Sequence, residues 1–178
     1  MEIATQNLES NREQWSSIDG YLNYEVSWFG RVRNGNTGRI LKPQTSTPGY
    51  LMVRLYKNGK WRIHYIHQLV AHEWASNPLE KRCVDHIDGN RTNNHHENLR
   101  YATHTENMRN KSKAANTTSV YYGVCWYKPT SKWKAQISID GKRTGLGYFS
   151  SEQEAAKAFN EAAQIHYGDY AKLNTFTD

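Results

Sequence analysis

The chain has 178 residues and a formal net charge of +6, from 23 lysines and arginines against 17 aspartates and glutamates. This balance favours a polyanionic partner without naming one. No apolar run is long enough to span a bilayer, and residues 1–14 lack the apolar core of a signal peptide. We therefore expect a cytoplasmic protein with no membrane partner. The two cysteines, Cys83 and Cys125, are expected to be reduced thiols and cannot form a four-cysteine zinc site.

The first third of the chain is rich in strand signals. Residues 24–27 lead through Gly30 to residues 31–33, and residues 50–56 lead to the sequence Lys57-Asn58-Gly59-Lys60. Short runs of β-branched and aromatic residues that end at an Asn-Gly pair predict antiparallel strands joined by a hairpin turn.

The next segment predicts a helix that ends before Asn77-Pro78. Residues 63–66 are a further strand or the approach to this helix. Ile66, Leu69, Val70 and Trp74 form an apolar stripe at helical spacing. The stripe leaves three histidines at the flanks of a packed face, which favours structural roles or phosphate contacts over zinc binding: His64, His67 and His72.

The most informative motif begins with Val84-Asp85-His86-Ile87 and continues into Asp88-Gly89. An apolar-flanked run followed by Asp-Gly predicts a strand that ends in a turn, and residues 99–102 can form the returning strand. The polar residues 90–97 between them must be loop. Thr103 and Glu106 then have the spacing of a capping box, which places Asn107 on the first or second turn of a helix.

This order of elements suits phosphodiester hydrolysis, which needs a base and a divalent cation together. A histidine such as His86 is a residue type that can act as a base at neutral pH, while Asp85 and Asn107 offer the oxygen atoms that Mg²⁺ or Mn²⁺ accepts. A lone Asp-His pair is more often a solvated turn, but the joint spacing favours a nuclease. His95 and His96 are either phosphate contacts or plain loop residues.

The motif resembles the HNH nucleases with a ββα-metal fold, and in particular phage and intron-encoded homing endonucleases. The resemblance rests on residues 84–90, Asn93-Asn94, 97–100 and Glu106-Asn107. It implies that Asp85 and Asn107 bind the cation, that His86 is the general base, and that Asn98 supports the loop or orients His86. The segment from Trp15 to Arg33 also looks like the short module that precedes such nucleases.

Residues 111–119 are polar and without periodicity, which indicates a linker. Beyond them, residues 121–127, 133–139 and 142–149 are expected to be strands. Ser151 and Glu154 open a helix that carries Ala155, Phe159, Ala162 and Ala163 inward and ends before Gly168. This segment resembles the Apetala-type, ethylene-response DNA-binding domain on residues 122–124, 133–135, 145–149, 154–156, 162–163, Gly168 and 173–174. That resemblance implies a three-stranded sheet that enters the major groove.

Basic and sheet-face residues are the candidate contacts with double-stranded DNA. Alternation along residues 133–139 puts Trp133, Ala135, Ile137 and Ile139 under the helix and leaves the intervening side chains facing outward. Arg31, Arg33 and Arg54 are each about as well explained as solvated strand residues, whereas the basic flanks favour DNA contact over a merely soluble sheet face for Lys134, Gln136 and Ser138. The candidates are Arg31, Arg33, Arg54, Arg109, Lys111, Lys113, Tyr122, Tyr127, Lys134, Gln136, Ser138 and Arg143.

The sequence therefore predicts a modular α+β protein, with a ββα-metal nuclease core and a three-stranded antiparallel sheet packed on one helix. The expected domains are a β-rich DNA-contact module at 1–62, a nuclease core at 63–110, a linker at 111–119 and an Apetala-type domain at 120–178. The expected function is that of a site-specific, metal-dependent homing endonuclease that nicks one DNA strand as a monomer. The alternatives are a DNA-binding regulator with an inactive scaffold and, less favoured, a structural zinc module.

Overall fold

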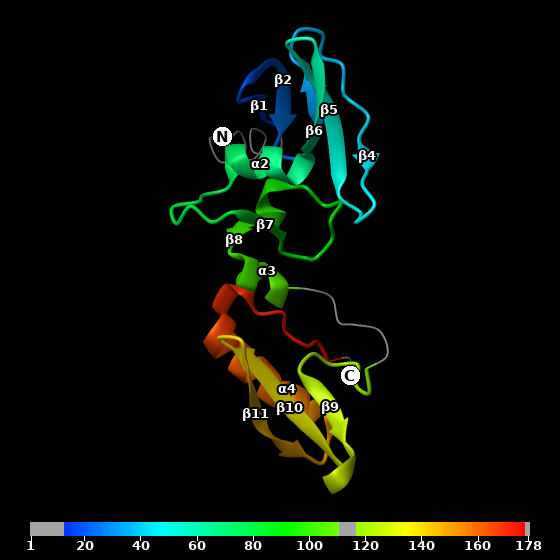
Figure 1. The fold of residues 1–178 in the computed structure, drawn as a ribbon, viewed down its shortest axis with the longest axis vertical. Helices are drawn as coiled ribbons and strands as arrows, with labels where there is room; N and C mark the ends of the chain where they lie inside the picture. Colours follow the sequence, from blue (N-terminus) through cyan, green and yellow to red (C-terminus); the bar gives the residue numbers. More distant parts are fainter. Residues whose placement is uncertain (1–12, 111–116, 177–178) are drawn as a thin grey trace, which may run out of the picture. The chain divides into compact units, whose positions relative to one another are not determined.

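The computed structural model describes residues 13–110 and 117–176, and it contains both helices and antiparallel sheets, as the α+β prediction required (Figure 1). The chain divides into two compact units, Met1–Thr103 and His104–Asp178. No helix in the described ranges combines the length and the apolar character needed to cross a membrane.

Two small sheets build the start of the first unit. One contains β1 (Trp15–Ile18), β2 (Tyr21–Ser27) and β3 (Val32–Asn34), in that order. The other contains β4 (Gln44–Thr45), β5 (Leu51–Lys57) and β6 (Lys60–Tyr65). The predicted strands and the turn at Asn58-Gly59 are confirmed. Strands β1 and β4 were not predicted, and the two residues of β4 are too few to show an alternation.

Helix α2 (Ile66–Trp74) lies between these sheets and the next hairpin (Figure 1). Its buried side chains pack with strand residues in one apolar core, which includes Val26, Val53, Leu55, Ile66 and Val70, all at most 2% exposed. The helix ends at its C-cap Ala75, before Asn77-Pro78, as predicted. The helix thus connects the N-terminal sheets to the elements that carry the Asp-His motif.

The Asp-His motif lies on a two-stranded hairpin. Strand β7 (Cys83–His86) pairs antiparallel with β8 (Leu99–Ala102), so that Asp85 faces Arg100 and His86 faces Leu99 across the ladder. The loop between them ends in a short 3₁₀ turn, η1 (His96–Asn98). Helix α3 (His104–Arg109) begins directly after Thr103, as the capping pattern predicted, and belongs to the second compact unit.

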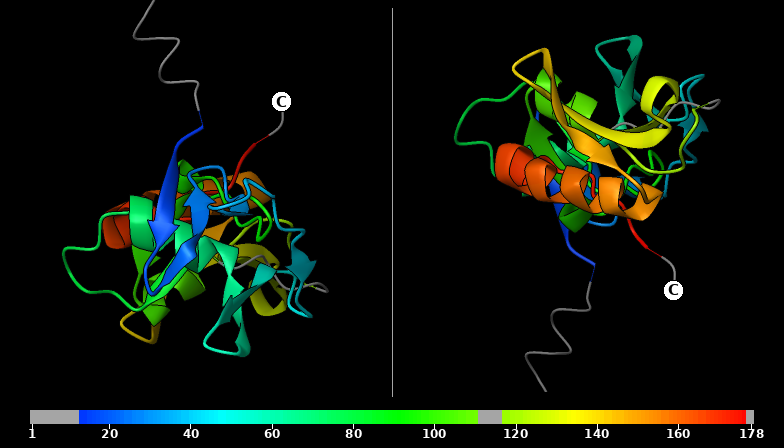
Figure 2. Two further views of the ribbon diagram at one scale, coloured as in Figure 1. Left: turned by 90° about the horizontal axis from the view of Figure 1, so that it is seen from above. Right: turned by 90° about the horizontal axis from the view of Figure 1, so that it is seen from below.

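Besides α3, the second unit contains a three-stranded antiparallel sheet that is covered by the helix α4. Strands β9 (Val124–Tyr127), β10 (Lys132–Ile139) and β11 (Lys142–Phe149) stand in the order β11-β10-β9. A 3₁₀ turn, η2 (Lys128–Thr130), joins the first two. Helix α4 (Glu152–Tyr167) lies across one face of the sheet and is followed by η3 (Gly168–Tyr170) (Figure 2).

The sequence pattern explains this packing. Ala135 and Ile137 of β10 are buried against Ala155, Phe159 and Ala163 of α4, as the alternation and the helical spacing predicted. The predicted capping box at the start of α4 is present, with both reciprocal hydrogen bonds between Ser151 and Glu154. Small alanines allow the helix to approach the sheet closely.

Strand β9 is shorter than the predicted strand 121–127. Gly123 has a positive φ of 71°, and a Cβ at this position would lie 1.9 Å from the Phe159 ring. The amide of Tyr122 is held by the Asn174 side chain at 2.6 Å instead of by a neighbouring strand. Close contact with the helix therefore turns residues 121–122 away from the sheet, while the carbonyl of Gly123 still accepts from the Gln136 amide of β10 at 2.8 Å.

Candidate active site at the β7–β8 hairpin

Asp85 is a buried carboxylate on β7 that is paired with Arg100 on the facing strand. Its side chain is 4% exposed, and Arg100 donates to the same oxygen, Oδ2, from Nε at 3.0 Å and from Nη2 at 2.8 Å. A buried carboxylate needs such a charged partner because desolvation is costly. Asp85 thus offers a fixed anionic oxygen pair of the kind that a divalent cation accepts.

His86 is equally buried, at 4% exposure, and its ring Nε2 lies 3.1 Å from Oδ1 of Asn94. Aromatic rings line the same place, because Tyr50 and His67 have their centroids 5.9 and 5.1 Å from that of His86. The sequence motif included Asn94 but assigned it no role. The loop after β7 folds back, so that Asn94 reaches the histidine at the strand end.

His67, on the first turn of α2, is the second histidine of this cluster. It is 7% exposed, and its Nδ1 has no hydrogen-bond partner in the part of the chain that the structure describes. Burial, with a further contribution from the charge of His86, lowers the pKa of His67 from 6.5 to about 4. His67 is therefore neutral at physiological pH. The helical pattern predicted a flanking position for it, whereas the fold turns it toward His86.

Asn98 and Asp88 hold the loop between the two strands. Asn98 accepts from the Asp88 amide at 3.0 Å and donates to the Asp88 carboxylate at 2.9 Å and to the Asn93 carbonyl at 2.8 Å. Burial alone would raise the pKa of Asp88, but hydrogen bonds from Asn93, from the Asn90 amide and from Asn98 lower it. Of the two predicted roles for Asn98, the geometry corresponds to loop support, and the ring of His86 is bonded to Asn94 instead.

A turn from the N-terminal module contacts this loop. The carbonyl of Trp28 accepts from the His96 amide at 2.8 Å, and the two rings stack with centroids 5.3 Å apart and a 10° interplanar angle. Phe29 lies 5.0 Å from the ring of His95. His95 and His96 thus contact the β2–β3 turn. Sequence spacing could not show this contact, because the partners are almost seventy positions apart in the chain.

Asn107, the second predicted metal ligand, is a half-buried residue of α3. Helix α3 and strand β7 belong to different compact units, so the pairing of Asn107 with Asp85 stays a prediction. The donor set itself suits the metal, since a carboxylate and an amide oxygen are hard ligands. Arg109, on the same helix, has its guanidinium 4.3 Å from the Tyr167 ring centroid.

Comparison with known families identifies these two segments. Residues 13–56 match the NUMOD4 motif, and residues 64–109 match an HNH endonuclease family. Protein 3.8 of Escherichia phage T7 is 30% identical over 102 residues, which cover 57% of this chain and 84% of that protein. The chain belongs to the HNH endonuclease family. Its HNH segment contains α2, the β7–β8 hairpin and α3.

The chain is also similar to the DNA endonuclease I-HmuI of Bacillus phage SP01. The two are 38% identical over 99 residues, which cover 55% of this chain and 57% of I-HmuI. A solved structure of DNA binding and cleavage by the HNH homing endonuclease I-HmuI matches with a TM-score of 0.53 and 28% identity, over 91% of this chain and 99% of that one. In the sequence comparison the chain thus spans just over half the length of this curated relative.

Similarity to plant proteins falls on a shorter stretch. Dehydration-responsive element-binding protein 2C of Arabidopsis thaliana is 44% identical over 59 residues, which cover 29% of this chain and 17% of that protein. This match is a partial hint of the Apetala-type domain expected from the sequence.

The arginines predicted to contact DNA in the NUMOD4 segment differ in their surroundings. Arg31 is paired with Glu13, and its Nε donates to that carboxylate at 2.8 Å. Arg33 is paired with Glu25 and lies 4.1 Å from the Trp15 ring centroid. Arg54 instead lines an open groove. A DNA contact by any of the three arginines stays a prediction. At Arg31 and Arg33 a phosphate would have to compete with the paired carboxylate.

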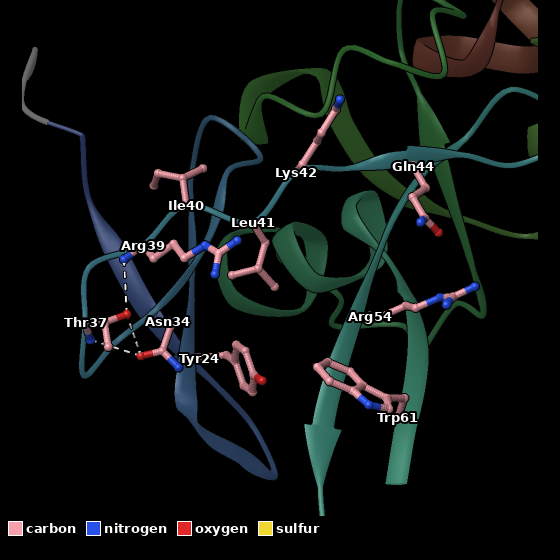
Figure 3. Close-up of a pocket in the computed structure, with 10 residues that line it drawn as sticks. All are labelled: Tyr24, Asn34, Thr37, Arg39, Ile40, Leu41, Lys42, Gln44, Arg54 and Trp61. Atoms are coloured by element: carbon pink, nitrogen blue, oxygen red, sulfur yellow. Dashed lines mark hydrogen bonds between the residues drawn. The ribbon is translucent and has the colours of Figure 1, made fainter.

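The groove at Arg54 combines cations with aromatic surface (Figure 3). Arg54 and Trp61 project from β5 and β6, while Arg39 and Lys42 come from the segment between β3 and β4. Trp61 is 65% exposed. The described lining side chains include three cations and no carboxylate. Such a surface is suited to a polyanion with stacking groups.

The outer face of the C-terminal sheet carries most of the remaining candidates. Lys134 and Gln136 are half-buried on β10, and Arg143 is exposed on β11 opposite Ser138, which is also exposed. Tyr127 lies on β9, with the ammonium of Lys134 5.9 Å from its ring centroid. Contacts of these side chains with DNA stay predictions.

The remaining candidates are Tyr122, Lys111 and Lys113. Tyr122 packs against the Ile137 and Phe159 core instead of lying in strand β9, which gives it a structural role beside the predicted one. Lys111 and Lys113 lie outside the described residues.

Proposed function

We propose that this protein is a metal-dependent, site-specific DNA endonuclease of the homing type, which nicks one strand as a monomer. The observation that supports this most directly is the buried hairpin pair, Asp85 and His86. The carboxylate is fixed by Arg100 and the imidazole is hydrogen-bonded to Asn94. A solvated turn would hold neither side chain in this way. Membership of the HNH family supports the same chemistry.

His86 would take the proton from the attacking water, because a neutral imidazole is a competent base near physiological pH. Asp85 and Asn107 would hold Mg²⁺ or Mn²⁺, which when bound neutralises charge on the phosphate and stabilises the leaving oxygen. Asn98 would keep the loop in shape through Asp88 and Asn93. Asp85, His86 and Asn107 would then act at the scissile phosphate, and Asn98 would support the loop beside them.

DNA would be held by surfaces outside the hairpin. The candidates are the cationic groove at Arg54 and Trp61 and the outer face of the β9–β11 sheet with Lys134 and Arg143. The relative I-HmuI binds and cleaves DNA, which supports DNA as the substrate here. A chain with one base and one cation site would cut one strand for each binding event.

A plasmid nicking assay tests this function. Supercoiled plasmids carrying candidate intron-insertion sequences would be incubated with the full chain in Mg²⁺, in Mn²⁺ and in a chelator. We expect open-circle product at one site with metal and none with the chelator. His86→Ala should lower the nicking rate about 10²- to 10⁴-fold and leave DNA binding unchanged. Equal nicking by the wild type and this variant would contradict the proposal.

A DNA-binding regulator with an inactive nuclease scaffold is the second candidate. One observation favours it, because the guanidinium of Arg100 already neutralises the predicted metal ligand Asp85. Specific DNA binding without cleavage at any metal concentration would support this alternative. Isothermal titration of the protein with Mn²⁺, in the wild type and in Asp85→Asn, would show whether a cation can share this carboxylate.

A further inference from the structure

We propose that the NUMOD4 segment is part of the catalytic centre, because its β2–β3 turn positions the general base through Asn94. In this proposal Gly30 and Trp28 are positioning residues that act on His86 through the loop between β7 and β8. The inference rests on the proposed function, in which His86 removes the proton from water. It assigns to the N-terminal module a role in the chemical step in addition to any role in DNA binding.

The hydrogen bonds of Asn94 fix the orientation of its side-chain amide. The amide nitrogen Nδ2 of Asn94 lies 3.3 Å from the carbonyl oxygen of Thr92, which can only accept. The amide oxygen Oδ1 therefore faces Nε2 of His86, at 3.1 Å. The reverse amide orientation would place two oxygens against each other.

An oxygen at this position selects one tautomer of His86. Because Oδ1 of Asn94 can only accept, Nε2 of His86 must carry the hydrogen, and the lone pair of the neutral ring then resides on Nδ1. Asn94 is 4% exposed, so this bond is shielded from water. Asn94 thus fixes both the ring orientation and the nitrogen that serves as the base.

Asn94 is in close contact with Gly30 of the β2–β3 turn. Gly30 has a φ of 80°, and a Cβ at this position would lie 2.6 Å from the Cβ of Asn94 and 3.1 Å from its carbonyl oxygen. Only glycine allows the backbone of the turn to pass so close to the loop. The backbone of Gly30 therefore limits where Asn94 can lie.

The turn that carries Gly30 is itself rigid. Ser27 is fully buried, and it bonds to the Gly30 amide at 2.9 Å through its carbonyl and to the Arg31 amide at 3.1 Å through its hydroxyl. Beside it, the Trp28 carbonyl holds the His96 amide, and the Trp28 ring stacks on His96. The loop is thus attached to the turn at two places, through Asn94 at Gly30 and through His96 at Trp28.

Gly30→Ala tests this link, with Gly59→Ala as its matched control. Gly59 has a similar φ of 77°, but a Cβ there would meet nothing within 4 Å. Both variants therefore carry the same backbone strain, and only the first displaces Asn94. In single-turnover nicking with saturating enzyme, we expect Gly30→Ala to be about 10- to 100-fold slower than Gly59→Ala, with the same affinity for DNA. Equal rates in the two variants would overturn the proposal.

Asn94→Gly keeps the proposal testable if Gly30→Ala fails to fold. This variant removes the hydrogen bond to His86 and changes no residue of the turn. We expect its nicking rate to fall by about 10- to 100-fold. In the Asn94→Gly background, a further Gly30→Ala change should add little, because both act on the same bond. A wild-type rate for Asn94→Gly, or losses that multiply in the double variant, would contradict the proposed link.

A ring-nitrogen measurement separates positioning from general damage. Nitrogen-15 spectra of the imidazole groups, with His86 assigned by its loss in His86→Ala, should show the Nε2–H tautomer in the wild type and in Gly59→Ala. Gly30→Ala and Asn94→Gly should show a mixture of tautomers. If the wild type itself does not nick DNA, the proposed function fails. If it nicks through His86 but its tautomer is unchanged in both variants, only the present inference fails.

Discussion

The hairpin loop and the C-terminal sheet are each stabilised by a different kind of interaction. Residues 88–98 are fixed by side-chain hydrogen bonds, by the Asp85–Arg100 pair on the two flanking strands and by close contact with Gly30. The β9–β11 sheet is fixed by apolar side chains packed under α4. A polar network fails when one partner is removed, whereas an apolar core loses stability in proportion to the volume removed. Function should therefore be more sensitive than stability to changes in the loop.

Asp85→Asn should have the largest effect, because it removes a predicted metal ligand and leaves the Arg100 charge without its partner. We expect nicking to be undetectable, and the free energy of unfolding of the first unit to decrease by about 3–5 kcal/mol. Urea denaturation with a tryptophan probe would measure the second effect. Asp85→Leu combined with Arg100→Leu should restore stability without restoring activity. Activity in the double variant would show that this ion-pair position is not part of the active site.

Phe159→Ala should be the most damaging single change in the C-terminal unit. The side chain is 8% exposed between the sheet and α4, and its removal should cost about 3–5 kcal/mol of stability. Ile165→Ala, on the same helix but 78% exposed, is the control and should change stability by less than about 0.5 kcal/mol. Thermal unfolding would compare the two. Similar losses would show that apolar packing does not hold this unit.

His67 should make the first unit less stable in mild acid. Its pKa in the folded protein is about 4, against 6.5 in the unfolded chain, so the unfolded chain binds the proton first as the pH falls. As the pH is lowered from about 6.5 to about 4, the free energy of unfolding should therefore decrease by about 3 kcal/mol in all. Above and below this range, the contribution of His67 to stability should not change with pH.

Replacing the histidines of α2 one at a time checks this pH dependence. His67→Gln should flatten the decline in denaturation experiments at several pH values. His72→Gln, at a far more exposed position on the same helix, should leave it unchanged. An unaltered decline in His67→Gln would mean that other groups cause it.

Arg143→Ala should show the smallest effect. Unlike the hairpin variants, it should weaken DNA binding and leave the rate of the chemical step unchanged. If this exposed side chain contacts a phosphate, its loss should weaken DNA binding at every sequence and reduce the slope of log affinity against log salt by about 1. The single-turnover rate at saturation should not change. Asp140→Asn, at the neighbouring turn, is the control for altered charge near the sheet edge. A slower chemical step in Arg143→Ala would contradict the separation of binding from chemistry.

Local patterns in the sequence were sufficient for most of the secondary structure. The Asn58-Gly59 turn, the Ser151–Glu154 capping box and the alternation along β10 depend on neighbours within a few positions, and all three are confirmed. The start of strand β9 was predicted wrongly. There the deciding contact is between Gly123 and Phe159, which are far apart in the chain.

The sequence by itself determined the chemical identity of the candidate site. Asp85, His86 and the turn after them could be recognised because their order and spacing within one hairpin are local. Tertiary structure decided which groups surround them. Arg100 and Asn94 reach Asp85 and His86 only when the hairpin and its loop have folded, and His67 and the Gly30 turn come from distant segments that burial of the apolar core brings to the hairpin. Spacing can therefore nominate the candidate reacting groups of the Asp-His motif, but only the fold could reveal what holds them in place.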